Sequence, residues 1–226
     1  MKTDVVLLPG LHGSGALYAS FVALAPSWTR CRPVALPTLG DQSFDGLAST
    51  LEAELKSLEG FVLVAESFSG PIAARLAARL GQKVALLVLC NPLVKVAFRL
   101  PARLAATLVA SKAMPAWCAA LGLAGGDRAL GKAALDEVRA LPKETLTGRL
   151  STVFAATADD LSSHLVAPLL TILGTRDRLV PQARARRVCA AVPFSTLVEL
   201  DAPHLVIQTK PAEVWTAISE EFESAA

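Results

Sequence analysis

A serine in a sharp turn is the first residue in this sequence whose surroundings suggest chemistry. The apolar run 61–65 leads into the turn ESFSG at 66–70, and a helical pattern follows at once. Small residues suit any tight turn, so a purely structural role is one explanation. A sharp strand-to-helix turn also presents the serine of a nucleophile elbow. We favour Ser67 as a nucleophile because a strand precedes it and a helix follows it.

A serine hydroxyl needs a general base, and the chain has three histidines to choose from. His12 lies in a glycine-rich loop, and His164 comes just before a predicted strand. His204 follows the last predicted strand, at the carboxyl edge where open α/β sheets bind their ligands. His204 is therefore the candidate base, and the alternative is an ordinary exposed loop histidine.

The third member of such a set is an acid that orients the histidine. Asp177 follows a predicted strand within GTRDRLVP. The chain order is then nucleophile, acid, base, the order of one class of serine hydrolases. Asp201 is the rival acid, although it lies only three residues before His204 and more plausibly orders that loop. Asp159 and Asp160 are weaker alternatives.

A glycine-rich loop, LLPGLHGSG at 7–15, follows the first predicted strand. A dinucleotide fingerprint would need glycines at G-x-G-x-x-G and an acidic residue at the end of the next strand. Here the glycines are Gly10, Gly13 and Gly15, and no such acidic residue is present. The better interpretation is a loop that donates a backbone N–H to an oxyanion.

The elements that position these residues alternate along the chain. Continuous apolar runs predict strands at 5–9, 32–37, 61–65, 83–92, 168–174 and 195–201. Helical patterns lie between most of them, as in crossovers of a parallel sheet. The sequence therefore predicts an α/β fold: a mostly parallel sheet of about six strands with helices on both faces. We expect one domain over residues 1–226, with a helical insertion at about 94–163.

Composition narrows the class of protein further. The chain has 226 residues, of which 53% are hydrophobic and 19% charged, which excludes a disordered chain. A formal net charge of +2 gives no reason to expect a nucleic-acid partner. No apolar run approaches the ~20 residues of a membrane span. The four cysteines lack zinc-site spacing, so we expect no metal, no cofactor and no disulfide framework, in a soluble cytoplasmic protein.

Together these motifs resemble the α/β-hydrolase superfamily. The resemblance rests on PGL at 9–11, AESFSG at 65–70, GTRD at 174–177 and PH at 203–204, and it spans nearly the whole chain. It implies a Ser67 nucleophile, a His204 base oriented by Asp177, and an oxyanion hole made by the backbone N–H groups of Leu11 and Phe68. The insertion then corresponds to the family's helical cap.

The sequence departs from the usual family pattern at a few places. Ala65 and Ser69 stand where the elbow usually has glycines, and Pro9 stands where many members have histidine. Two leading strands of the family also have no counterpart here. None of these departures removes a catalytic group.

These inferences predict a serine esterase that acts on a small-molecule ester, with the cap forming an acyl pocket. The apolar cap residues expected to contact substrate are Leu104, Leu108, Trp117, Leu146, Leu150 and Phe154. The buried-strand position of Glu66 favours a structural role over proton transfer, since its side chain should point away from that of Ser67.

Two alternatives stay open. One is a thioesterase or methyl esterase that acts on an acyl chain bound to a carrier protein. The cap's basic residues would then meet an acidic carrier, or they only keep the cap soluble; they are Arg99, Arg103, Lys112, Arg128 and Lys132. The other alternative is a non-catalytic ligand-binding module, because a fold does not determine a function.

Overall fold

The computed structural model describes residues 2–95, 101–111, 115–165, 168–180, 182–193 and 195–225. Within these ranges six strands form one parallel sheet in the order β2-β1-β3-β4-β5-β6. The strands are β1 (Thr3–Leu8), β2 (Thr29–Pro33), β3 (Phe61–Glu66), β4 (Val84–Cys90), β5 (Leu169–Gly174) and β6 (Ser195–Leu200). The predicted α/β class and the number of strands are confirmed.

Alternate residues of the central strands supply two separate cores. Val6 and Leu8 of β1 pack into the core on one face of the sheet, whereas Val5 and Leu7 pack into the core on the other. Every residue of β3 and β5 is buried. Because both faces are covered, these strands do not alternate apolar with polar residues, and they appear as continuous apolar runs in the sequence.

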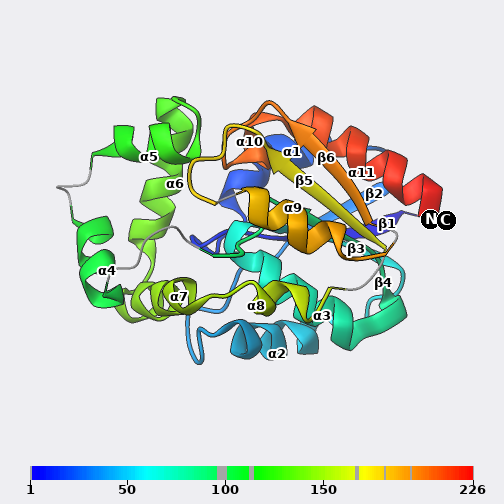
Figure 1. The fold of residues 1–226 in the computed structure, drawn as a ribbon, viewed down its shortest axis with the longest axis horizontal. Helices are drawn as coiled ribbons and strands as arrows, with labels where there is room; N and C mark the ends of the chain where they lie inside the picture. The colour runs from blue at the N-terminus through cyan, green and yellow to red at the C-terminus, as the bar shows by residue number, and fades with distance from the viewer. Residues whose placement is uncertain are drawn as a thin grey trace.

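Helices cover both faces of the sheet, as Figure 1 shows. On one face Trp215 stacks on Phe21 with ring centroids 4.3 Å apart and donates its indole N–H to the Phe21 carbonyl at 2.8 Å. This face carries α1 (Ala19–Ala23), α10 (Val206–Thr209) and α11 (Pro211–Ala225), and the other face carries α2 (Phe44–Leu55), α3 (Gly70–Leu80), α8 (Asp159–Ser162) and α9 (Gln182–Ala190). In the described ranges the chain also forms short 3₁₀ turns, η1 (Ala16–Tyr18), η2 (Ser67–Ser69) and η3 (Gly81–Lys83). None of the helices in the described ranges is both long and apolar enough to cross a membrane.

The second strand differs from its prediction, which was residues 32–37. The observed β2 is Thr29–Pro33, an edge strand paired only with β1. An edge strand is partly exposed and therefore carries polar residues, so the apolar run was the wrong signal for it. The residues after β2 instead form a loop, in which the Leu36 N–H donates to the Gly13 carbonyl at 2.8 Å.

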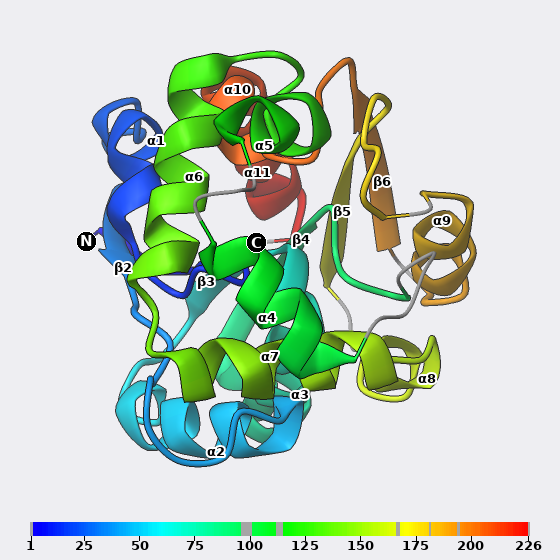
Figure 2. The same cartoon turned by 90° about the vertical axis from the view of Figure 1, so that its left-hand side faces the viewer.

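The helical insertion lies between β4 and β5. It contains α4 (Ala102–Ala110), α5 (Ala116–Leu123), α6 (Arg128–Ala140) and α7 (Lys143–Ala155), followed by α8. Helix α4 packs on α7, and α5 packs on α6. Figure 2 shows α4, α5, α6 and α7 in front of the ends of the strands. We call these four helices the cap.

Candidate active site

Ser67 occupies a strained turn between β3 and α3. Its φ is +51°, in the left-handed region that a serine rarely adopts. Such a conformation costs on the order of 1–3 kcal/mol and persists only where the surroundings hold it. The Ser67 carbonyl accepts the Leu93 N–H at 2.8 Å. Gly70 allows this approach, because a Cβ there would lie 2.8 Å from Pro92 Cβ.

The same turn is tied to the loop that follows β1. The Ser69 hydroxyl donates to the Pro9 carbonyl at 2.5 Å and is fully buried. A Cβ on Gly10 would lie 3.7 Å from Ser67 Cβ, so the two loops are in contact. Ser69, which departs from the glycine of the resembled pattern, thus supplies a bond that a glycine lacks.

Ser67, His204 and Asp177 form one chain of hydrogen bonds. His204 Nε2 lies 2.8 Å from Ser67 Oγ, and His204 Nδ1 lies 2.7 Å from Asp177 Oδ2. The His204 and Asp177 side chains are only 3% and 1% exposed. A buried carboxylate that holds one ring nitrogen leaves the other free to take a proton from the serine.

The Asp177 side chain is held through both of its carboxylate oxygens. Asp177 Oδ1 accepts the backbone N–H groups of Leu179 and Val180 at 2.7 and 3.1 Å. The rival Asp201 points elsewhere: it forms an ion pair with Arg176 at 2.7 Å, and its side chain is 79% exposed.

The weaker candidates also lie away from His204. Asp160 pairs with Arg75 at 3.1 Å and accepts the Thr157 N–H at 2.9 Å. Asp159 is the first residue of α8, beside it.

Asn91, which no sequence motif marks as a site residue, holds the loop that contains His204. It is buried directly after β4, with a φ of +43°. Its Nδ2 donates to the His204 carbonyl at 2.7 Å and the Pro203 carbonyl at 3.2 Å, while its Oδ1 accepts the Gly174 N–H at 2.8 Å. The sequence gives one indication of this role: Asn91 is a polar residue directly after a buried strand, within LCNP at 89–92.

Gly174 brings the acid loop and the histidine loop together. A Cβ at this position would lie 2.5 Å from the carbonyl oxygens of both Ala202 and Pro203. Only glycine fits this approach, which places the segment containing Asp177 beside the segment containing His204.

The predicted oxyanion donors lie on the two loops that meet at Ser67. Phe68 follows Ser67 in the elbow, and Leu11 follows Gly10, whose position contacts Ser67 Cβ. Leu11 belongs to a turn closed by a bond from the Gly13 N–H to the Gly10 carbonyl at 3.0 Å. Leu11, Ser67 and Phe68 all line the same cavity.

Glu66 lies on the other side of the strand from this cavity. It is fully buried, and its Oε2 accepts Gln208 Nε2 at 3.1 Å and lies 3.3 Å from the Tyr18 hydroxyl. Burial raises the pKa of its carboxyl. The side chain of Glu66 thus bonds to Tyr18 and Gln208 rather than to Ser67, which fits a structural role.

The other two histidines make no bond to Ser67 in the described structure. His12 is 5% exposed, and neither ring nitrogen has a hydrogen-bond partner among the described residues. Burial lowers its pKa to about 4, so the ring is neutral near pH 7. His164 is half-buried beyond α8, with its backbone N–H bonded to the Leu161 carbonyl at 3.2 Å.

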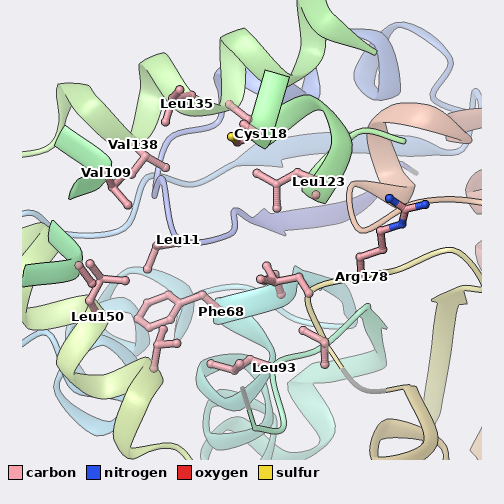
Figure 3. A pocket seen from close by; sticks show the side chains of 18 of the residues that line it. Leu11, Phe68, Leu93, Val109, Cys118, Leu123, Leu135, Val138, Leu150 and Arg178 are labelled. Atoms are coloured by element: carbon pink, nitrogen blue, oxygen red, sulfur yellow. The ribbon is translucent and has the colours of Figure 1, made fainter. Parts of the chain in front are cut away.

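A cavity of about 500 Å³ opens at Ser67 and extends beneath the cap. Figure 3 shows side chains from the cap helices, with Leu11, Phe68 and Leu93, around this space. The side chains that line the cavity are almost all apolar, and the volume of the cavity is in the range of small-molecule sites. Arg178 is the charged residue among those that line it, and its guanidinium turns away from the centre.

Three of the six predicted substrate contacts line this cavity, namely Leu108, Leu150 and Phe154. Leu104, Trp117 and Leu146 are not among the residues that line it, so their contact with substrate stays a prediction. Leu104 and Trp117 are exposed, at 49% and 57%. Leu146 is fully packed between α4 and α7. The apolar composition of a helix does not say which of its faces meets the cavity.

The basic residues considered for a carrier protein are dispersed. Arg103 lies on α4, and Arg128 and Lys132 lie on α6, where Lys132 pairs with Asp136 at 2.5 Å. Arg99 and Lys112 fall outside the described residues. Among the described residues, no cluster of three or more His, Cys, Asp or Glu side chains could hold a metal ion.

The fold and the order of the site residues define the class of protein. Residues 5–217 match the sequence profile described as the alpha/beta hydrolase family, and the chain belongs to this family of hydrolases. No curated protein sequence matches the chain significantly.

Solved structures with the same fold include enzymes of distant sequence. The enol-lactonase from Burkholderia xenovorans LB400 is 20% identical over 99% of this chain and 92% of its own, with a TM-score of 0.79. The thermophilic esterase from Thermogutta terrifontis is 18% identical over 100% of this chain and 91% of its own, with a TM-score of 0.79. A hydrolase from Oleispira antarctica is 14% identical over 99% and 92% of the two chains, with a TM-score of 0.85. At these identities the likeness concerns the fold.

Proposed function

We propose that the protein is a serine hydrolase that cleaves carboxylic esters through an acyl-enzyme intermediate. The observation that carries the proposal is the continuous hydrogen-bonded chain from Ser67 through His204 to Asp177, with distances of 2.8 and 2.7 Å. This arrangement turns a weakly nucleophilic hydroxyl into a reactive one. Membership of the alpha/beta hydrolase family supports the same chemistry.

In the first half of the reaction Ser67 Oγ attacks the carbonyl carbon of the ester while His204 Nε2 takes the hydroxyl proton. The carbonyl oxygen becomes an oxyanion, which the Leu11 and Phe68 N–H groups stabilise. The tetrahedral intermediate then expels the alcohol, and His204 returns the proton to the leaving oxygen. Asp177 stabilises the imidazolium that exists between these two proton transfers.

In the second half a water molecule replaces the alcohol. His204 Nε2 takes a proton from the water as its oxygen attacks the acyl carbon of the Ser67 ester. The second tetrahedral intermediate releases the carboxylic acid, and the proton returns to Ser67 Oγ. The residues of the site thus end in their starting state.

The cavity supports an ester with an apolar acyl chain. Its wall is built from aliphatic and aromatic side chains of the cap together with Leu11, Phe68 and Leu93. A chain that fills it removes apolar surface from water, which favours binding by about 25 cal/mol per Å². The fold shared with an esterase and an enol-lactonase also supports ester cleavage.

Labelling with a fluorophosphonate tests the nucleophile, because only an activated serine attacks such a phosphorus centre quickly. We expect intact-mass analysis to show one adduct on the wild-type protein and none on Ser67→Ala. A set of p-nitrophenyl esters from acetate to dodecanoate tests the reaction itself. An adduct on another residue, or an active protein without an adduct, would remove Ser67 from its assigned role.

The same screen includes a methyl ester and a thioester of an acyl-carrier protein. Hydrolysis of these at a higher kcat/KM than any free ester would move the substrate class to carrier-bound acyl chains. Absence of hydrolysis of every ester, together with absence of labelling, would contradict the proposed function and favour a binding module.

A further inference from the structure

Arg149, on helix α7 of the cap, is the largest of the fully buried side chains. It is 0% exposed, and within the described residues it forms no ion pair with a carboxylate. Burial alone lowers the pKa of its guanidinium to about 10, so the group remains charged near pH 7. A buried cation without a counter-charge is costly unless its hydrogen bonds are satisfied, so its bonds indicate its role.

The bonds of Arg149 go to neutral oxygens on separate loops. Nη1 donates to the Leu11 carbonyl at 2.9 Å. Nη2 donates to the carbonyls of Pro37 at 3.0 Å and Leu36 at 3.3 Å, and Nε donates to Gln42 Oε1 at 3.1 Å. The guanidinium therefore joins the turn after β1 to the loop after β2, both at the carboxyl edge of the sheet.

The turn is shaped around this guanidinium. Gly13 has a φ of +75°, and a Cβ there would lie 2.1 Å from Arg149 Nη1. The Gly13 carbonyl accepts the Leu36 N–H at 2.8 Å, so the turn after β1 and the loop after β2 are also joined directly. The turn at 10–13 thus has Ser67 against Gly10 on one side and the guanidinium against Gly13 on the other.

We propose that Arg149 is a positioning residue for the oxyanion hole. By holding the Leu11 carbonyl, it fixes the turn 10–13 so that the Leu11 N–H faces the carbonyl oxygen of the substrate. Helix α7 of the cap then supports the reacting centre as well as the acyl cavity. The catalytic part of this inference rests on the proposed serine hydrolase function.

Two substitutions separate the geometry of the guanidinium from its charge. Arg149→Met removes the charge and every bond. Arg149→Lys keeps the charge, but its single ammonium cannot reproduce a planar fork that reaches the two loops at once. We expect both variants to lower kcat for p-nitrophenyl butyrate by ~10- to 100-fold and to change KM by less than ~3-fold. The reason is that a displaced Leu11 N–H would lose its bond to the oxyanion, and that bond forms only in the transition state.

Thr145→Val is the matched control. Thr145 lies one helical turn before Arg149 on α7, is buried, and donates to the Thr38 carbonyl at 2.6 Å. Thr145 thus anchors helix α7 to the loop after β2, and its bond does not involve the turn 10–13. We expect this variant to lower Tm while kcat stays within ~2-fold of the wild type, because the bond lost is structural.

A readout without substrate tests the positioning itself. In ¹⁵N–¹H spectra of the free protein, we expect the backbone amides of residues 10–13 to shift or broaden in both Arg149 variants. We expect them to remain in place in Thr145→Val. Circular dichroism identifies which variants fold, and Arg149→Lys alone decides the question if Arg149→Met does not fold.

Several results would overturn the inference. A folded Arg149 variant with unmoved amides at 10–13, or with wild-type kcat, would do so. An equal loss of kcat in Thr145→Val would also do so, because the effect would then be one of general stability. If the wild-type protein cleaves no ester and takes up no fluorophosphonate, the proposed function fails, and the amide spectra by themselves decide whether Arg149 positions the turn.

Discussion

Asp177 is bound through both carboxylate oxygens, and this makes its replacement by asparagine informative. Oδ1 accepts the N–H groups of Leu179 and Val180, and Oδ2 meets His204 Nδ1. An asparagine must place its oxygen toward the two backbone donors, so its NH₂ faces His204. That arrangement favours the imidazole tautomer with the proton on Nε2, which cannot accept the proton of Ser67.

We therefore expect Asp177→Asn to fold normally and to lower kcat by up to ~10⁴, the scale of the same change in a serine protease. Asp201→Asn is the control, because its exposed pair with Arg176 contributes little. We expect this variant to change kcat by less than ~3-fold. Measured kcat values and circular dichroism for both variants check the assignment. A large loss of kcat in Asp201→Asn, with nearly wild-type kcat in Asp177→Asn, would reverse it.

Glu66 shows how a buried carboxyl beside the nucleophile can affect stability. Its raised pKa means that the folded protein holds this proton more tightly than the unfolded chain does. Its contribution to stability is therefore greatest below the ordinary pKa of 4.5 and decreases as the pH rises toward the raised folded value. Near neutral pH and above, the native state bears the cost of this burial.

We expect Glu66→Gln, which is neutral at every pH, to match the wild type at about pH 4 and to be more stable at about pH 8. A glutamine oxygen can still accept from Gln208. Urea unfolding across this pH range provides the measurement, with the exposed Glu54→Gln on α2 as the control. A Glu66→Gln variant that is less stable than the wild type at pH 8 would show that the ionised carboxylate stabilises the fold.

Helix α4 of the cap carries two leucines that form a matched pair for mutation. Leu104 and Leu108 lie one turn apart on α4 and are each 49% exposed, but only Leu108 lines the cavity. The difference between them isolates contact with substrate from general effects of truncating a cap residue.

We expect Leu108→Ala to lower kcat/KM for p-nitrophenyl octanoate by ~3- to 10-fold and to leave p-nitrophenyl acetate almost unaffected. A short acyl group stays near Ser67, whereas a longer one extends along the cavity wall. Leu104→Ala should change neither substrate. Equal losses for the two esters, or equal losses for the two variants, would contradict an acyl pocket beneath the cap.

At the scale of the whole molecule, the ends of the parallel strands are joined by one amide side chain. Asn91 follows β4, binds the N–H of Gly174 at the end of β5, and binds the carbonyl of His204 beyond β6. It thereby sets the histidine loop relative to the sheet.

We expect Asn91→Ala to lower the free energy of unfolding by ~2–4 kcal/mol, since it removes the side-chain bonds to the Gly174 N–H and to the carbonyls of Pro203 and His204. We also expect a lower kcat, because the backbone of His204 loses its support. Asn91→Asp is the comparison: it still accepts the Gly174 N–H but cannot donate to His204 when ionised. Urea unfolding and kcat measure both effects, and an Asn91→Ala variant with wild-type values would refute this role.

Much of the architecture could be predicted because it depends on local patterns. The buried strands β3 and β5 are continuous apolar runs, and the turn at Ser67 follows directly from such a run. The second strand was misplaced because an edge strand carries no such signal. The cap was predicted as helical, but the faces that line the cavity depend on how α4–α7 pack together.

Local patterns in the sequence were enough to predict the fold class and the order in which Ser67, Asp177 and His204 follow separate strands. The reason is that the carboxyl ends of parallel strands share one edge, so strand prediction alone places such residues together. The tertiary structure decided which aspartate meets His204, and it brought in Asn91 and Arg149. Asn91 bonds His204 across 113 residues and Arg149 bonds Leu11 across 138. Partners so distant leave no local pattern, because only packing brings them within hydrogen-bond distance.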